Sequence, residues 1–180
     1  MSVSIVFETH SWSEDNDRGV ATGWLPGRLS DRGRVLAAEL GARRRGEVDA
    51  VFSSDLTRAV ETAQIAVAGT DLPLLLDWRL RECDYGELNG QPRDVVRVAS
   101  QLDVPFPGGE SWRQAVRRVG GFLTDLPSRW SGRRVLVIGH VATRWALDHY
   151  LGHVSLEALA EAEFDWREGW EYRIEGDLLI

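Results

Sequence analysis

The sequence has one cysteine, no long apolar run and no excess of basic residues. Cys83 stands alone among 180 residues, so the chain can form no internal disulfide, and we expect it in the reducing cytoplasm. No apolar run approaches the length of a transmembrane helix, and the N-terminus lacks a basic-then-apolar signal pattern. The net charge of -7 argues against nonspecific binding to nucleic acid or to an acidic membrane surface.

The remaining composition is that of an ordinary globular protein. Hydrophobic residues make up 43% and charged residues 27%, which is typical of soluble domains. A chain of 180 residues suits one domain with a sizeable core, so we expect a single domain over residues 1–180. The eight tryptophans are unusual. We interpret them first as core and rim packing, and only second as a cage for a substrate.

Apolar strands alternate with amphipathic helices along the chain. The continuous apolar run 135–139 is typical of a strand at a sheet centre, covered on both faces. Residues 12–29 show no sustained periodicity and are interpreted as a long functional loop. The alternation predicts a three-layer α/β/α sandwich with a mostly parallel central sheet. The predicted strands are 3–7, 51–52, 72–76, 135–139, 170–174 and 178–180, and the predicted helices are 31–44, 56–67, 93–102, 112–126 and 140–151.

Three of these elements carry finer predictions. Ser30 is expected to cap the helix over 31–44, with Val35, Leu36 and Leu40 facing the core. Pro73 in the strand over 72–76 favours either an edge of the sheet or the first position of the strand. The last two strands are joined by the segment 175–177, which favours a hairpin.

The stretch 51–63 changes from a short apolar strand directly into a helix. Ser54 or Asp55 can cap the start of this helix, where the first backbone N–H groups lack internal partners and attract anions. Arg58 lies in the first turn, where a cation opposes the helix dipole unless a negative group is near. The arrangement predicts an anion site at the carboxyl end of the sheet.

This stretch resembles the SSDLxRAxxTA motif of the histidine phosphatase superfamily, which includes the cofactor-dependent phosphoglycerate mutases. Three further resemblances follow in the order of that family, and together they cover most of residues 3–150. They are Leu80-Arg81-Glu82 with Tyr85-Gly86 and Gly90 (the acid-bearing loop), Pro107-Gly108-Gly109-Glu110-Ser111 (the segment before a helix) and Val135 to His140 (the strand ending in the second histidine). The resemblance implies a phosphoglycerate mutase-like fold.

His10 and His140 each end an apolar strand, and in an α/β sheet both ends lie at the edge where ligands bind. A lone histidine there would be a structural residue, but two histidines with Arg58 favour a functional site. By resemblance, His10 is the nucleophile that takes up the phosphoryl group, while His140 and Arg58 hold the phosphate. Glu82 is then the general acid for the leaving oxygen and the base for water, although a solvated loop carboxylate is the alternative. No cofactor and no metal are implied.

The first motif departs from the family, because Thr9-His10-Ser11 stands where Arg-His-Gly is usual. The missing arginine removes a charge and a bidentate fork from the expected phosphate pocket. Thr9 and Ser11 could donate neutral hydrogen bonds to the substrate instead.

Three charged neighbours could occupy the space of the missing arginine, and two of them, Arg18 and Arg28, could substitute for its charge. Glu8 adds a carboxylate whose direction the sequence does not fix, and Arg18 and Arg28 lie in the following loop. A surface position is the better interpretation of each loop arginine. We nevertheless favour a pocket rebuilt for another ligand, with Glu8 or a loop arginine in the vacated space, over a weakened phosphate site.

Other reactive residues carry weaker signals. Cys83 has no histidine close in sequence, which argues against a nucleophilic role. His149 and His153 have the i, i+4 spacing of a metal pair, but Gly152 is expected to break the helix between them. The acidic segment 12–17 lacks the glycine and glutamate spacing of a calcium loop.

The sequence therefore predicts a metal-independent phosphatase that acts on a small phosphomonoester through a phosphohistidine intermediate. The expected partner is a small phosphorylated metabolite. Three alternatives stay open: a nearly inactive member that binds an anionic ligand, a mutase-type phosphotransferase, and an enzyme whose altered pocket serves a different or less charged group.

Overall fold

A five-stranded sheet lies at the centre of the computed structural model, which describes residues 2–176 and 178. The strand order is β4-β3-β6-β1-β7, and all neighbours are parallel except β7, which runs antiparallel to β1. The strands are β1 (Ser2–Thr9), β3 (Ala50–Ser53), β4 (Leu74–Leu76), β6 (Arg134–Gly139) and β7 (Trp170–Glu175). β6 lies in the middle and β4 at an edge, which confirms both predictions from the sequence.

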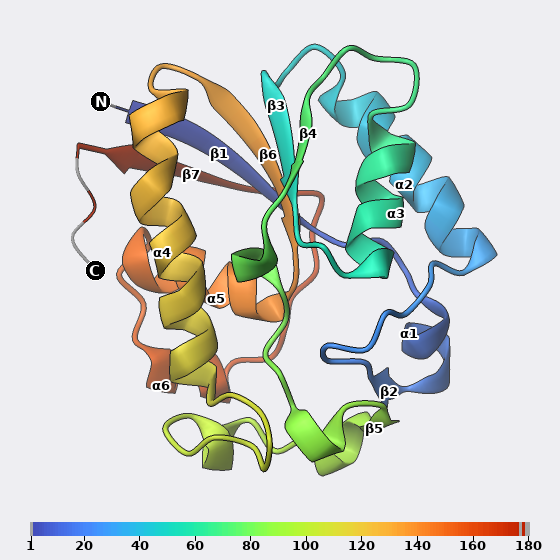
Figure 1. Ribbon diagram of the computed structural model, residues 1–180, viewed down its shortest axis with the longest axis vertical. Helices are drawn as coiled ribbons and strands as arrows, with labels where there is room; N and C mark the ends of the chain where they lie inside the picture. The colour runs from blue at the N-terminus through green and yellow to red at the C-terminus, as the bar shows by residue number, and fades with distance from the viewer. Residues whose placement is uncertain (1, 177, 179–180) are drawn as a thin grey trace.

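Helices cover both faces of this sheet (Figure 1). One face carries α2 (Asp31–Arg44) and α3 (Thr57–Ala66), and the other carries α4 (Trp112–Trp130) and α5 (Val141–Tyr150), with the short α6 (Leu156–Glu161) beside α5. Side chains of successive strand residues lie on opposite faces of the sheet. In β1, Val6 belongs to the apolar cluster with Ala59 of α3, and Phe7 belongs to the cluster with Trp112 of α4. The architecture is the predicted three-layer α/β/α sandwich.

The loops at one end of the sheet contain short elements that the sequence did not indicate. The predicted loop over 12–29 holds a five-residue helix, and the predicted helix over 93–102 consists of two separate 3-10 turns. Val96, whose backbone is extended at φ -85° and ψ 94°, interrupts the predicted helix over 93–102. The elements are α1 (Glu14–Arg18), β2 (Val20–Ala21), η1 (Trp78–Leu80), η2 (Gly86–Leu88), β5 (Gln91–Pro92), η3 (Arg93–Val95) and η4 (Ala99–Gln101).

β2 and β5 pair antiparallel as a separate two-stranded sheet. This pairing ties the loop after β1 to the loop after β4, two segments far apart in the sequence. The backbone N–H of Gly90 donates to the carbonyl of Ala21, and that of Arg93 donates to the carbonyl of Gly19, each at 2.8 Å. These hydrogen bonds extend the connection at both ends. The backbones of the two loops are therefore joined side by side.

The helix α2 packs differently from its predicted face. Ser30 caps it as expected, with its hydroxyl accepting a bond from the backbone of Gly33, and Leu40 is buried. The prediction is wrong for Val35, which is 59% exposed, and Leu36 is only half-buried. The helix approaches the loop after β1 through Gly33, where a Cβ would meet a backbone oxygen, so small residues rather than branched ones form this contact.

β7 confirms the predicted strand over 170–174. The predicted strand over 178–180 and the turn before it include residues 177, 179 and 180, which lie outside the described residues. Among the residues that are described, no helix combines the length and apolar character needed to cross a membrane.

Candidate active site

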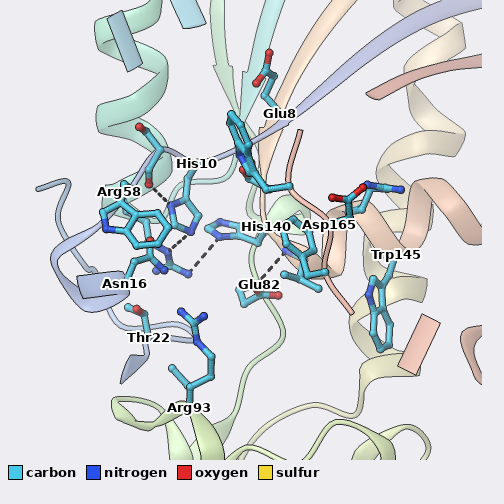
Figure 2. A pocket seen from close by; sticks show the side chains of 18 of the residues that line it. Glu8, His10, Asn16, Thr22, Arg58, Glu82, Arg93, His140, Trp145 and Asp165 are labelled. Atoms are coloured by element: carbon cyan, nitrogen blue, oxygen red, sulfur yellow. Dashed lines mark hydrogen bonds between the residues drawn. The ribbon is translucent and has the colours of Figure 1, made fainter. Parts of the chain in front are cut away.

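The structure brings the four predicted catalytic residues together at one edge of the sheet. His10 follows β1, His140 follows β6, Arg58 lies in the first turn of α3, and Glu82 follows η1. All four line one cavity of about 690 Å³ (Figure 2). The carboxyl ends of parallel strands meet at this edge, which explains why sequence positions after strands predicted the cluster.

The imidazole of His10 is held in one tautomer. Its Nδ1 lies 2.7 Å from the carbonyl oxygen of Ser11, and because a carbonyl only accepts, Nδ1 carries the hydrogen. Nε2 is left with its lone pair, toward which Arg58 Nε donates over 3.3 Å. Burial, together with the charges of Arg58 and Arg93, lowers the pKa of His10 to about 3. The ring is therefore neutral near pH 7, with Nε2 as its basic nitrogen.

Arg58 joins the two histidines to the loop after β1. The side chain is 2% exposed, and its guanidinium donates to the carbonyl oxygens of Gly23 at 2.9 Å and Leu25 at 3.1 Å. Nη2 also lies 3.3 Å from Nδ1 of His140, whose ring centroid is 5.1 Å from that of His10. These contacts fix a cation between the two rings.

His140 is also neutral. Because Arg58 donates to its Nδ1, the hydrogen lies on Nε2 and is donated to Ser54 Oγ over 2.7 Å. Burial, followed by the charge of Arg58, lowers the pKa of His140 well below its ordinary value. The predicted helix cap is wrong, since α3 begins after Leu56 without a side-chain cap. Ser54 accepts from His140 instead, and Asp55 accepts from Arg81. Ser54 follows β3 and His140 follows the neighbouring strand β6, so the hydroxyl of Ser54 lies within hydrogen-bond distance of His140.

Glu82 accepts hydrogen bonds from three backbone N–H groups. They belong to Cys83 at 2.9 Å, Ala142 at 3.0 Å and Val141 at 3.3 Å, so the carboxyl group lies at the N-terminus of α5. Burial raises the pKa of Glu82 above its ordinary value, and these bonds and the charge of Arg58 limit the rise. A carboxyl group with a raised pKa keeps its proton closer to neutral pH, as a general acid requires.

Arg118, which the sequence analysis missed, supports the loop that carries Glu82. From α4, its guanidinium donates to the carbonyl oxygens of Arg79 at 2.7 Å, Arg81 at 3.1 Å and Glu82 at 3.0 Å. It also forms an ion pair with Glu110 over 2.7 Å. Glu110 belongs to the segment before α4 that resembles the family, so that motif holds the acid-bearing loop in place.

The two altered residues of the first motif both line the cavity. The hydroxyl of Ser11 donates to the carbonyl of Gly33 over 2.6 Å, and its backbone N–H donates to Thr62 over 2.9 Å. A phosphate would thus compete with Gly33 for the hydroxyl hydrogen of Ser11. Thr9 pairs with Gly139 of β6 in the sheet register, which places it beside the start of α5.

Glu8 is directed at α2. It is 2% exposed, and Arg44 donates to Oε1 from Nε at 3.0 Å and from Nη2 at 2.9 Å, while Arg43 donates to Oε2 at 3.4 Å. Burial raises the pKa of Glu8, and the two guanidinium groups oppose that rise. The carboxylate is therefore a partner of α2 and does not occupy the place of the missing arginine.

The loop arginines do not occupy that place either. Arg18 is an exposed partner of Asp15 at 2.6 Å, and Arg28 is exposed and does not line the cavity, which confirms the surface interpretation of both. The rebuilt pocket that we favoured from the sequence required Glu8 or one of these arginines beside Thr9, and the structure contradicts that arrangement.

A different arginine, Arg93, supplies positive charge to the cavity. It begins η3, lines the cavity, and extends toward Arg58 and the two histidines in Figure 2. Its charge contributes to lowering the pKa of His10. The sequence analysis missed it because the pairing of β2 with β5, which no local pattern indicates, brings this segment to the site.

The remaining reactive residues lie outside this arrangement. Burial raises the pKa of the Cys83 thiol, which disfavours the thiolate that a nucleophile needs. His149 bonds to the carbonyl of Val154 over 2.8 Å. His153 lies beyond the end of α5 with φ 56°, so the two histidines do not share a helix.

The comparisons agree with this geometry. A sequence model of the histidine phosphatase superfamily (branch 1) matches residues 5–168. A 2,3-bisphosphoglycerate-dependent phosphoglycerate mutase of Azorhizobium caulinodans is 32% identical over 194 residues, covering 98% of this chain and 94% of the relative. Bacillus stearothermophilus YhfR is similar in structure, with a TM-score of 0.83, 25% identity, and coverage of 97% of this chain and 92% of that one. A mycobacterial glucosyl-3-phosphoglycerate phosphatase shares the fold, with a TM-score of 0.76, 22% identity, and coverage of 89% and 84%. The chain therefore belongs to the histidine phosphatase superfamily.

Proposed function

We propose that this protein hydrolyses a phosphomonoester, without a metal, through a phosphohistidine at His10. The observation that carries the proposal is the fixed neutral tautomer of His10, which leaves Nε2 as a nucleophile beside Arg58. Nε2 attacks phosphorus in line, and the bond from phosphorus to the leaving oxygen breaks as Glu82 gives its proton to that oxygen. Water then attacks the phosphohistidine, Glu82 takes a proton from the water, and inorganic phosphate leaves.

The phosphoryl oxygens are held by the cations at this end of the cavity. Arg58 is preorganised by its bonds to the loop after β1, and Arg93 adds a second charge from η3. A bound dianion would oppose the effect of Arg58, the second cause after burial of the lowered pKa of His140, and would raise that pKa.

Phosphoglycerate mutase activity is the second candidate, because a relative 32% identical carries that name. A mutase must also hold the carboxylate of glycerate while the intermediate reorients. Of the arginines that line the rest of the cavity, Arg43 and Arg144 are already paired with Glu8 and Asp148, at 3.4 and 2.7 Å, and Arg32 lies 5.1 Å from the ring of Trp12. This pairing favours hydrolysis over retention of an anionic intermediate.

Trapping the intermediate tests the proposal. The protein is incubated with a ³²P-labelled phosphomonoester at mildly acidic pH and quenched in alkali, in which phosphohistidine survives. We expect label in the wild type and in His153→Asn, a control outside the cavity, and no label in a folded His10→Ala variant. Turnover without label, or label that persists in His10→Ala, would remove His10 from the mechanism.

Two further assays separate the alternatives. Conversion of 3-phosphoglycerate to 2-phosphoglycerate in the presence of 2,3-bisphosphoglycerate, faster than phosphate release, would favour the mutase. Binding of inorganic phosphate without label or turnover on a panel of phosphomonoesters would favour a protein that only binds an anion.

A further inference from the structure

The cavity extends beyond the phosphate-holding residues into a part lined by aromatic side chains. Four of the eight tryptophans line the cavity, although none belongs to the catalytic group. We define the aromatic wing as Trp112, Trp145, Phe164 and Trp166. In Figure 2, Trp145 lies on the opposite side of His140 from Arg58, so the wing begins where the phosphate site ends.

The inner wall of the wing is a pair of buried indole rings. Trp112 and Trp145 are 2% and 7% exposed, and their ring centroids lie 4.4 Å apart with 34° between the planes. The indole N–H of Trp112 is buried and has no hydrogen-bond partner in the described part of the chain.

The outer wall is a pair of exposed aromatic rings. Phe164 and Trp166 lie between α6 and β7 and are 47% and 57% exposed, although both line the cavity. Large apolar side chains gathered at the mouth of a concave site are typical of a surface that a ligand covers. An aromatic ring in this part of the cavity would be lined by aromatic side chains of both walls.

The charges around the wing disfavour a second anionic group. Glu163 and Asp165 are exposed on the same outer segment and line the cavity, and Arg144 is engaged by Asp148 at 2.7 Å. An anionic leaving group would meet these carboxylates, and the ion pair with Asp148 already balances the charge of Arg144. The wing therefore fits a neutral group.

We infer that the aromatic wing binds the leaving group of the substrate, and that this leaving group is a neutral alcohol carrying an aromatic ring. The inference rests on the proposed function, which places the phosphoryl group at His10. It names the substrate class as aryl-bearing phosphomonoesters rather than phosphorylated acids.

Two alkyl phosphates with similar leaving-group basicity provide the test. The wild type should favour 3-phenylpropyl phosphate over propyl phosphate by roughly 10- to 100-fold in kcat/KM, chiefly through KM. Trp166→Ala should remove most of this preference, because it should lower kcat/KM for 3-phenylpropyl phosphate far more than for propyl phosphate. Trp78→Ala is the matched control, because Trp78 is 54% exposed but does not line the cavity, and it should preserve the preference.

Binding of the matching phosphonates by calorimetry separates this inference from the proposed function. Tighter binding of 3-phenylpropylphosphonate than of propylphosphonate, lost in Trp166→Ala but without turnover of either phosphate, would refute the phosphatase and support the wing. Equal binding of the two phosphonates, or equal kcat/KM for the two phosphates, would overturn the wing even if both phosphates are hydrolysed.

Discussion

Replacing Arg93 by glutamine tests whether a loop arginine supplies the charge that Thr9 does not. Removing a single charge-assisted contact to a developing anion costs about 10²–10³-fold in rate. Arg93 is exposed and therefore screened, so we expect a smaller loss than this, roughly 10- to 100-fold in kcat/KM. His10 stays neutral near pH 7 in the variant, because burial and Arg58 are the larger causes of its lowered pKa. The loss therefore reports on phosphate binding and not on protonation of the nucleophile.

The assay compares Arg93→Gln with Arg97→Gln, an exposed arginine nearby in the chain that does not line the cavity. Both variants are measured for p-nitrophenyl phosphate turnover, inhibition by inorganic phosphate, and the pKa of His10 by NMR. Arg93→Gln should weaken phosphate inhibition and raise the pKa of His10, and Arg97→Gln should do neither. Equal effects of the two substitutions, or turnover within about twofold of wild type for Arg93→Gln, would refute the reasoning.

Three further substitutions test separate parts of the site. Glu82→Gln should slow hydrolysis of alkyl phosphates by about 10²–10⁴-fold and that of p-nitrophenyl phosphate far less. Wild-type activity should fall as rising pH removes the proton from Glu82, and the variant should not show this fall. Equal losses on both substrates would point to a structural role of Glu82. Glu8→Gln should lower the free energy of unfolding in urea by about 2 kcal/mol, which is less than for a fully buried ion pair because the arginine partners are partly exposed. The control is Glu47→Gln, at an exposed partner of Arg44, which should change the free energy of unfolding by less than about 0.5 kcal/mol. Thr9→Arg should tighten inhibition by phosphate by roughly tenfold, since Glu8 is directed at α2 and neither Arg18 nor Arg28 lines the cavity. A stable variant with unchanged inhibition would show that the site is more than a weakened phosphate pocket.

The parts of the fold that local patterns encode could be predicted from the sequence. The continuous apolar run of β6 placed it at the sheet centre, and Ser30 marked the start of α2. His10 and His140 could be predicted as site residues because each follows a strand directly, and strand ends share one edge. Their tautomers could not, because partners distant in the sequence set them.

The missed features depend on contacts between distant segments. From the sequence, the hydroxyl of Ser54 could either cap α3 or bond to His140. It bonds to His140 because β3 and β6 are neighbours in the sheet. Arg93 reaches the site through the pairing of β2 with β5, each only two residues long. Elements of that length carry no periodicity for sequence reasoning to detect.

The position of β6 between β1 and β3 also constrains how the chain acquires its structure. β1 and β3 are not hydrogen-bonded to each other, and the strand that connects them comes much later in the chain. During synthesis from the N-terminus, the first half of the sheet therefore cannot close until β6 has been made. Such non-local pairing slows folding and leaves strand edges unpaired meanwhile. The strands that precede His10 and Arg58 therefore gain their shared neighbour only once the segment that ends at His140 has been made.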